Sequence, residues 1–97
     1  MRFTDAFVHY RSNRGYGPRR IQQELKEKGI NDELIDEFID ERDPEWQESM
    51  LEVWQKKFSS KPDDYKEQSR QSRFLQYRGF SGESIQRLFK QLKQDED

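Results

Sequence analysis

The chain has 97 residues, of which 30% are hydrophobic and 39% charged, with a net charge of −2, so it can form one domain with a small core but not two independent domains. The absence of cysteine excludes disulfides, thiolate metal sites and a cysteine nucleophile. Because no apolar run approaches the roughly 20 residues that cross a bilayer and the first residues lack the apolar segment of a signal peptide, we expect a cytoplasmic protein with no membrane contact.

Three helices are predicted in the first part of the chain. The first covers about residues 3–14, the second covers about residues 18–28, where Pro18 suits the first helical turn, and the third begins after Asn31. Helical spacing predicts that the following apolar residues face the core: Phe3, Phe7, Tyr10, Ile21, Leu25, Leu34, Ile35, Phe38 and Ile39.

Three more helices are predicted in the second part. They cover about residues 44–59, after the capping Asp43, then about residues 63–78, and finally the segment from Ser81 to the acidic tail at residues 95–97. The middle one is the least clearly amphipathic. The apolar residues predicted to face the core are Trp46, Met50, Val53, Trp54, Phe58, Tyr65, Phe74, Leu75, Tyr77, Ile85, Leu88, Phe89 and Leu92.

A short phrase occurs twice, at residues 28–35 and 78–85, and each copy reads cation, glycine, large apolar residue and helix-capping residue. Gly29 and Gly79 can take the positive φ that ends a helix, after which the next apolar residue folds back onto a leucine four positions before the glycine. Asn31 and Ser81 can then cap the following helix. We therefore predict an all-α fold of two tandem three-helix repeat units, residues 1–42 and 43–97, in an elongated array where each unit helps to cover the other.

Charge is segregated along the chain. Residues 9–28 hold six Lys/Arg and two Glu, residues 31–52 hold one Arg and ten Asp/Glu, and residues 56–93 hold ten Lys/Arg and four Asp/Glu. Such blocks can present one surface to an anionic partner and another to a basic one, although charged runs on helical proteins are commonly just solvated faces.

Catalytic and metal sites are not indicated. One histidine, His9, and scattered serines offer no nucleophile with its base, and the acidic block lacks the order of an EF-hand loop. Residues 15–18 lack the lysine spacing of a phosphate loop and read as a helix–helix turn. Beside Arg14, Arg19 and Arg20, however, this turn can also bring the N–H groups of the second helix close to a phosphate.

Arginines interleaved with aromatic residues give the strongest chemical signal. Cations can neutralise phosphates while aromatic rings stack on bases, but the same residues can equally be core or rim residues and solvating charges. They are Tyr10, Arg11, Arg14, Tyr16, Arg19 and Arg20 in the first unit and Arg70, Arg73, Tyr77 and Arg78 in the second.

Several multi-residue motifs, in order, resemble the bacterial RecX family, whose members modulate the RecA recombinase. These motifs are residues 6–8, 14–21, 24–25, 28–30, 73–75 and 77–80. RecX proteins are built from tandem three-helix units, usually three. The resemblance implies that this chain holds the middle and C-terminal units of that arrangement, either as a truncated chain or as a naturally shortened member.

The resemblance implies a non-enzymatic monomer without cofactors that lies in the groove of the RecA filament on single-stranded DNA. There it would inhibit strand exchange, ATP hydrolysis and coprotease activity, and so modulate DNA repair and the SOS response. Acidic residues of the third and fourth helices would meet basic patches on RecA. The residues assigned to the filament-facing surface, which includes possible direct contacts with single- or double-stranded DNA, are Arg11, Arg14, Arg19, Arg20, Lys26, Arg70, Arg73 and Arg78.

Two alternatives remain open at this point. One is an autonomous nucleic-acid-binding module that binds bare strands with a steep salt dependence and needs no recombinase. The other is a structural fragment that self-associates through an exposed aromatic surface near Trp46 and Trp54.

Overall fold

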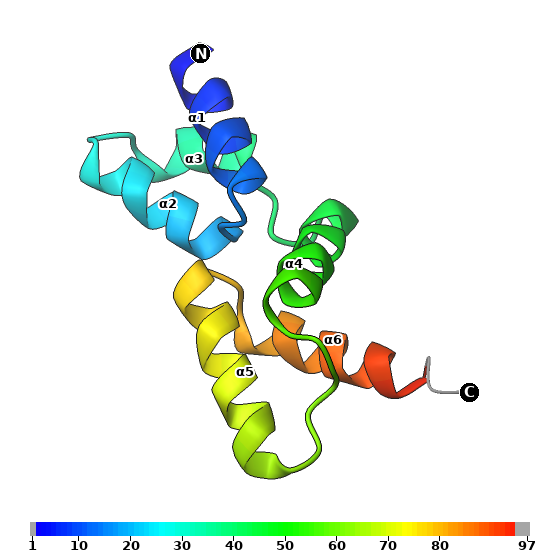
Figure 1. The fold of residues 1–97 in the computed structure, drawn as a ribbon. Helices are drawn as coiled ribbons and strands as arrows, with labels where there is room; N and C mark the ends of the chain where they lie inside the picture. The colour runs from blue at the N-terminus through cyan, green and yellow to red at the C-terminus, as the bar shows by residue number, and fades with distance from the viewer. Residues whose placement is uncertain (1, 95–97) are drawn as a thin grey trace.

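The computed structural model describes residues 2–94, and within this range the chain forms six α-helices and no strand, which confirms the predicted all-α class (Figure 1). The predicted acidic tail lies outside the described residues. The helices are α1 (Arg2–Asn13), α2 (Pro18–Glu27), α3 (Asp32–Phe38), α4 (Pro44–Lys57), α5 (Tyr65–Arg78) and α6 (Gly82–Gln94).

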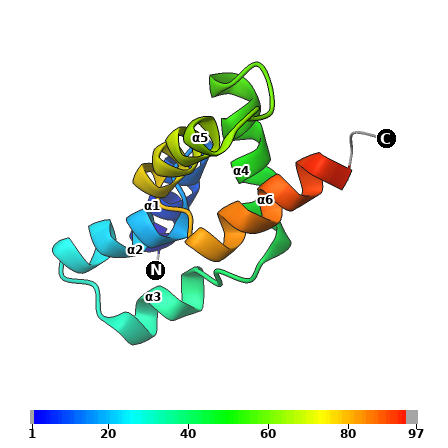
Figure 2. The same ribbon diagram turned by 90° about the horizontal axis from the view of Figure 1, so that it is seen from below.

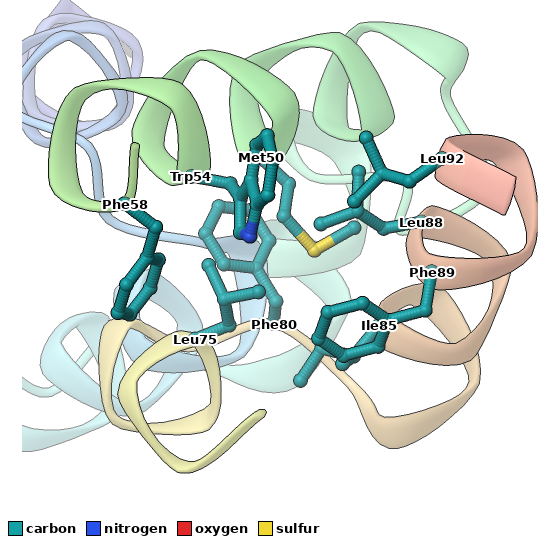
Figure 3. Packing of buried hydrophobic residues seen from close by; sticks show 9 residues of the cluster. All are labelled: Met50, Trp54, Phe58, Leu75, Phe80, Ile85, Leu88, Phe89 and Leu92. Atoms are coloured by element: carbon teal, nitrogen blue, oxygen red, sulfur yellow. The ribbon is translucent and has the colours of Figure 1, made fainter. Parts of the chain in front are cut away.

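The helices form two groups of three along an elongated body of 44 × 23 × 20 Å, as predicted (Figure 1). Each group has its own buried cluster. The smaller cluster contains Ile21, Leu25, Ile35 and Ile39. The larger one, shown in Figure 3, contains Met50, Trp54, Phe58, Leu75, Phe80, Ile85, Leu88, Phe89 and Leu92. The division of the chain between residues 42 and 43 stays a prediction.

Both copies of the repeated phrase adopt the predicted helix stop. Gly29 has a φ of 90° and Gly79 a φ of 106°. The Ile30 N–H donates to the Leu25 carbonyl at 3.0 Å, and the equivalent bond in the second copy, from residue 80 to residue 75, measures 3.2 Å. The side chain of Asn31 then caps α3, and Ser81 Oγ accepts from the N–H of residue 84 at the start of α6. The repeat is therefore a structural unit that ends one helix and starts the next.

The two units help to cover each other, and this packing buries part of the aromatic surface considered above. Trp46 on α4 packs, half-buried, against the cluster of the first unit. Trp54 is only 6% exposed and lies within the cluster of the second unit. Trp54 is therefore not part of an exposed surface, whereas Trp46 stays partly accessible.

Four aromatic residues predicted to face the core are exposed instead: Phe3 (53%), Tyr10 (57%), Tyr65 (84%) and Tyr77 (77%). On α1 the face turned toward the protein contains Thr4, Phe7 and Val8, so Phe3 and Tyr10 fall at its margins. On α5 the two buried residues are Gln71 and Leu75. The aromatic residues misled the assignment of these faces because a buried threonine and a buried glutamine occupy the inward positions.

Candidate interface at the junction of the two units

The start of α2 meets the end of α5 head to tail, and we call this contact the α2–α5 junction (Figures 1 and 2). The Gly17 N–H donates to the Arg78 carbonyl at 2.6 Å, and the Arg19 N–H donates to the Gly79 carbonyl at 3.0 Å. The positive end of one helix thus faces the negative end of the other. Because the carbonyls of Arg78 and Gly79 take up the N–H groups of Gly17 and Arg19, these two groups are not available to a phosphate.

Two glycines make this close approach possible. A Cβ added to Gly17 would lie 2.6 Å from the backbone carbon of Gly79, and a Cβ added to Gly79 would lie 2.5 Å from the Cβ of Arg20. Real Cβ atoms do not approach other heavy atoms so closely. The glycines at positions 17 and 79 therefore fix how the two units meet.

Arginines from both units converge on Tyr16 beside the junction. The guanidinium carbons of Arg11, Arg20 and Arg78 lie 3.9, 4.6 and 4.9 Å from the centre of the Tyr16 ring. Two of these arginines also cross between the units, because Arg20 Nη1 donates to the Tyr77 carbonyl and Arg78 Nη1 donates to the Arg14 carbonyl, each at 3.1 Å. Cation–π contacts and hydrogen bonds thus join the units around one ring.

Arg11 and Glu24 form a two-bonded ion pair under this cluster. Arg11 Nε and Nη2 donate to the two Glu24 oxygens at 2.9 and 2.7 Å, and the Arg11 side chain is only 17% exposed. Burial by itself raises the pKa of Glu24, but the hydrogen bonds and positive charge of Arg11, supported by Arg20, outweigh it and leave the pKa below its ordinary value. Arg11 is accordingly committed to contacts within the protein.

The other proposed contact residues of the first unit lie further outside. Arg14 is exposed, with its guanidinium carbon 5.7 Å from the centre of the Tyr10 ring. Arg19 is 62% exposed and pairs with Glu41 at 3.0 Å. Lys26 is exposed near the far end of α2, where it lies 3.6 Å from Asp32. These exposed pairs are weak, so a partner can displace them at little cost.

A second cationic surface lies on the outward face of α5 and consists of Lys66, Arg70, Arg73 and Tyr77, which we call the α5 ridge. All four are exposed, and their spacing of i, i+4, i+7 and i+11 places them on one face. The side chain of Arg73 forms no hydrogen bond or ion pair within residues 2–94. Cations beside an exposed ring are a combination that suits nucleic acid.

Arg70 is held in place by Glu67. Its Nε and Nη2 donate to the two Glu67 oxygens at 2.9 and 2.8 Å. These hydrogen bonds, with another from Gln71, lower the pKa of Glu67 to about 2. The Arg70 guanidinium carbon also lies 5.2 Å from the centre of the Phe58 ring, so the ridge is anchored to the core of its unit.

The structure therefore divides the predicted contact residues into three sets, one of which consists of the exposed Arg14, Arg19 and Lys26. Arg11, Arg20 and Arg78 meet at Tyr16, whereas Arg70 and Arg73 lie along the outward face of α5. Lys66 was not predicted as a contact residue, although its helical spacing from Arg70 and Arg73 places it on the same face. No role was predicted for Glu24, which pairs with Arg11 on another helix, or for Glu67, which pairs with Arg70 one turn away.

The described part of the chain contains no group of three or more metal-ligating side chains. None of the helices between residues 2 and 94 combines the length and the apolar character that a bilayer span requires.

Comparison with known proteins identifies both units. Residues 1–39 match the RecX second three-helix domain, and residues 43–89 match the RecX third three-helix domain. A "Regulatory protein RecX" of Pseudomonas entomophila is 46% identical over 88 residues, which are 90% of this chain and 57% of that relative. A "Regulatory protein RecX" of Legionella pneumophila is 40% identical over 94 residues, which are 96% of this chain and 63% of the relative. The chain thus spans about three fifths of the length of these relatives, and with both of its units matched it belongs to the RecX family.

Proposed function

We propose that this chain is a non-enzymatic cytoplasmic regulator that lies in the groove of the RecA filament on single-stranded DNA. Bound there, it inhibits recombinase, ATPase and coprotease activities and so modulates DNA repair and the SOS response. One observation carries the proposal: two consecutive RecX three-helix domains account for residues 1–39 and 43–89, and the relatives are named regulatory proteins. The link to RecA comes from the resemblance to the RecX family.

The shape of the molecule supports this function. The body is 44 Å long and 20 to 23 Å across, and the α2–α5 junction joins its halves through hydrogen bonds from both units. An elongated body with a fixed angle between its halves can follow a groove and contact neighbouring subunits together. A flexible pair of units would lose entropy on binding, whereas a preorganised pair avoids this cost.

We assign the predicted contact residues two roles on the filament-facing surface. Arg14, Arg19, Lys26, Arg70 and Arg73 are exposed and contact the filament directly. The other three, Arg11, Arg20 and Arg78, hold the surface in shape around Tyr16, where Arg20 is exposed and Arg11 and Arg78 are half-buried.

Fluorescence anisotropy of the labelled chain tests this function. The chain is titrated against RecA filaments assembled on single-stranded DNA, against bare DNA and against free RecA, each at two salt concentrations. We expect preferential binding to the filament together with inhibition of its ATP hydrolysis. The absence of filament binding by the wild-type chain would overturn the proposal.

Charge-reversal variants test whether the α5 ridge is the surface that contacts the filament. We expect the Lys66→Glu/Arg73→Glu variant to bind the filament about tenfold or more weakly. The control is Lys90→Glu/Lys93→Glu, which makes the same change of charge at exposed positions of α6. Equal losses in both variants would count against the α5 ridge as the contact surface and indicate a general effect of net charge.

An autonomous nucleic-acid-binding module is the second candidate, and the exposed α5 ridge favours it. In that case the wild-type chain would bind bare single strands as tightly as filaments, with a steep dependence on salt. The same titration therefore separates the two functions.

A further inference from the structure

A cleft of about 670 Å³ lies between α1 and α4, and of the eight proposed contact residues only Arg14 and Arg78 line it. Its volume falls within the range of roughly 300–1,000 Å³ typical of ligand sites. The apolar residues that line it are all half-buried: Val8, Phe38, Trp46, Val53 and Phe74. The first three pack against the core of the first unit and the other two against that of the second, so the lining is anchored in both units.

The polar lining is divided by charge. One stretch is acidic, with Asp5 from α1, two aspartates from the loop before α4 and three glutamates from α4. The acidic residues are Asp5, Asp40, Asp43, Glu45, Glu48 and Glu52. The basic lining residues are Arg14, Lys56, Lys57 and Arg78, which lie at the ends of α1, α4 and α5. The cleft thus has an acidic stretch and a basic stretch.

The three glutamates of α4, Glu45, Glu48 and Glu52, form no ion pair within residues 2–94. They stand at i, i+3 and i+7 along one face of the helix, a spacing at which like charges repel each other. Across the cleft, Asp5 Oδ1 lies 3.7 Å from His9 Nε2. A cationic ligand would relieve this repulsion, whereas a phosphate chain would increase it.

We propose that this cleft binds a short lysine- or arginine-rich segment of a protein partner, with an apolar side chain of that segment seated against Trp46. The basic side chains lie along Glu45, Glu48 and Glu52, and the basic stretch of the cleft requires the segment to become neutral or acidic at its other end. The proposal deepens the proposed function, on which it rests for the identity of the partner. It assigns the cleft to the protein subunits of the filament and leaves the α5 ridge for nucleic acid.

The two tryptophans provide a direct readout. In a ¹H–¹⁵N spectrum of the full chain, the indole signal of Trp46 is assigned with a Trp46→Phe variant, and Trp54, buried in the second core, serves as the internal reference. The probe is a synthetic peptide of lysine, arginine and leucine, and its counterpart replaces the cations by glutamate. We expect the basic peptide to shift the Trp46 signal saturably and to leave the Trp54 signal in place.

Matched variants test the charge selection. We expect Glu48→Gln/Glu52→Gln to weaken binding of the basic peptide about five- to tenfold. The control is Glu33→Gln/Glu37→Gln, which removes two exposed carboxylates with the same i, i+4 spacing from α3, outside the cleft. We expect the control to change the affinity by less than about twofold.

The proposal is overturned if the basic peptide leaves Trp46 unshifted, if both double variants weaken binding equally, or if single-stranded DNA shifts Trp46 as strongly as the basic peptide. Filament binding by the wild-type chain, measured separately, decides the proposed function. A chain that binds filaments but leaves Trp46 unshifted by the basic peptide would keep its proposed function and lose this cleft assignment, so the two failures are distinguishable.

Discussion

Gln71 shows how one polar side chain can hold a core together. It is buried on α5, its Oε1 accepts from Trp54 Nε1 at 2.8 Å, and its Nε2 donates to Glu67 at 2.9 Å and to the Ser60 carbonyl at 3.3 Å. Both ends of the amide are therefore satisfied. This one side chain links α4, the loop after it and the first turns of α5.

Replacement of Gln71 by alanine should destabilise the fold more than its size suggests. The Gln71→Ala change leaves the buried Trp54 N–H without an acceptor, which costs about 1–3 kcal/mol of unfolding free energy. Urea unfolding followed by far-UV circular dichroism measures the loss. The matched control is Gln76→Ala at an exposed position of the same helix, expected to stay within about 0.5 kcal/mol of wild type. Equal stabilities of the two variants would contradict the role assigned to the amide.

Glu67 makes the stability of the fold depend on pH. The hydrogen bonds from Arg70 and Gln71 lower its pKa from an ordinary 4.5 to about 2. Because the folded chain holds the proton less tightly than the unfolded chain, this contribution to stability is fully present above the ordinary pKa. It is lost as the pH falls through the folded value, so the window runs from about pH 4.5 down to about pH 2.

We therefore expect the Glu67→Gln variant to lose less stability than the wild-type chain as the pH falls. The urea midpoint of the wild-type chain should fall between pH 5 and pH 2, and that of the variant should fall less, because it cannot take up this proton on unfolding. Low salt keeps the exposed pair from being screened. The Glu37→Gln variant, which changes an exposed carboxylate on α3, serves as the comparison. If both variants lost as much stability as wild type between pH 5 and pH 2, Glu67 would not carry this effect.

At the scale of elements, much of the architecture followed from local signals. The glycine stops, the Asn31 and Ser81 caps and the apolar spacing of α2 and α6 all depend on residues within a turn or two of each other. These signals predicted six helices, their order and the two-unit repeat correctly. Local chemistry was sufficient here because capping and helical periodicity are local properties.

The inward face of α5 could not be predicted in the same way. A polar sequence with tyrosines at residues 65 and 77 suggested that the rings face inward, whereas Gln71 and Leu75 do so. Gln71 is buried only because a tryptophan from another helix bonds to it, which is a nonlocal fact. The candidate interface could not be predicted either, because no sequence pattern indicates that Arg11, Arg20 and Arg78 meet at Tyr16. The contact roles of all eight predicted residues stay predictions.

The two glycine stops provide a matched pair for measuring the junction. Gly29 and Gly79 both have positive φ, but a Cβ at Gly29 would meet nothing within 4 Å, whereas a Cβ at Gly79 would meet Arg20. Gly29→Ala should cost about 1–2 kcal/mol, the strain of alanine in the left-handed region. Gly79→Ala should cost that amount plus a further 1–3 kcal/mol for overpacking at the junction. The difference in unfolding free energy between the two variants measures the cost of overpacking at the α2–α5 junction. Equal costs would show that the two units can move apart there without loss of stability.

At the scale of the whole molecule, the junction determines whether the chain behaves as one body or as two connected units. A Gly17→Ala substitution tests the role of the junction without local backbone strain, because the φ of −88° and ψ of 172° at this position are accessible to alanine. A Cβ at this position therefore strains no local geometry. It acts through two contacts in the other unit, the backbone of Gly79 at 2.6 Å and the ring of Phe80 at 2.8 Å.

We expect Gly17→Ala to keep the helices and to loosen their arrangement. The new methyl group must push the end of α5 away, which stretches the two backbone hydrogen bonds and moves Arg78 from Tyr16. Small-angle X-ray scattering should then give a larger radius of gyration than wild type, while far-UV circular dichroism stays unchanged. Filament affinity should fall as well, because a loosened body must be ordered again on binding. Gly82→Ala, where a Cβ meets nothing within 4 Å, should match wild type in all three measurements. If the Gly17→Ala variant scattered like wild type yet bound filaments poorly, residue 17 would lie in the contact surface itself and the junction would not be what sets the shape.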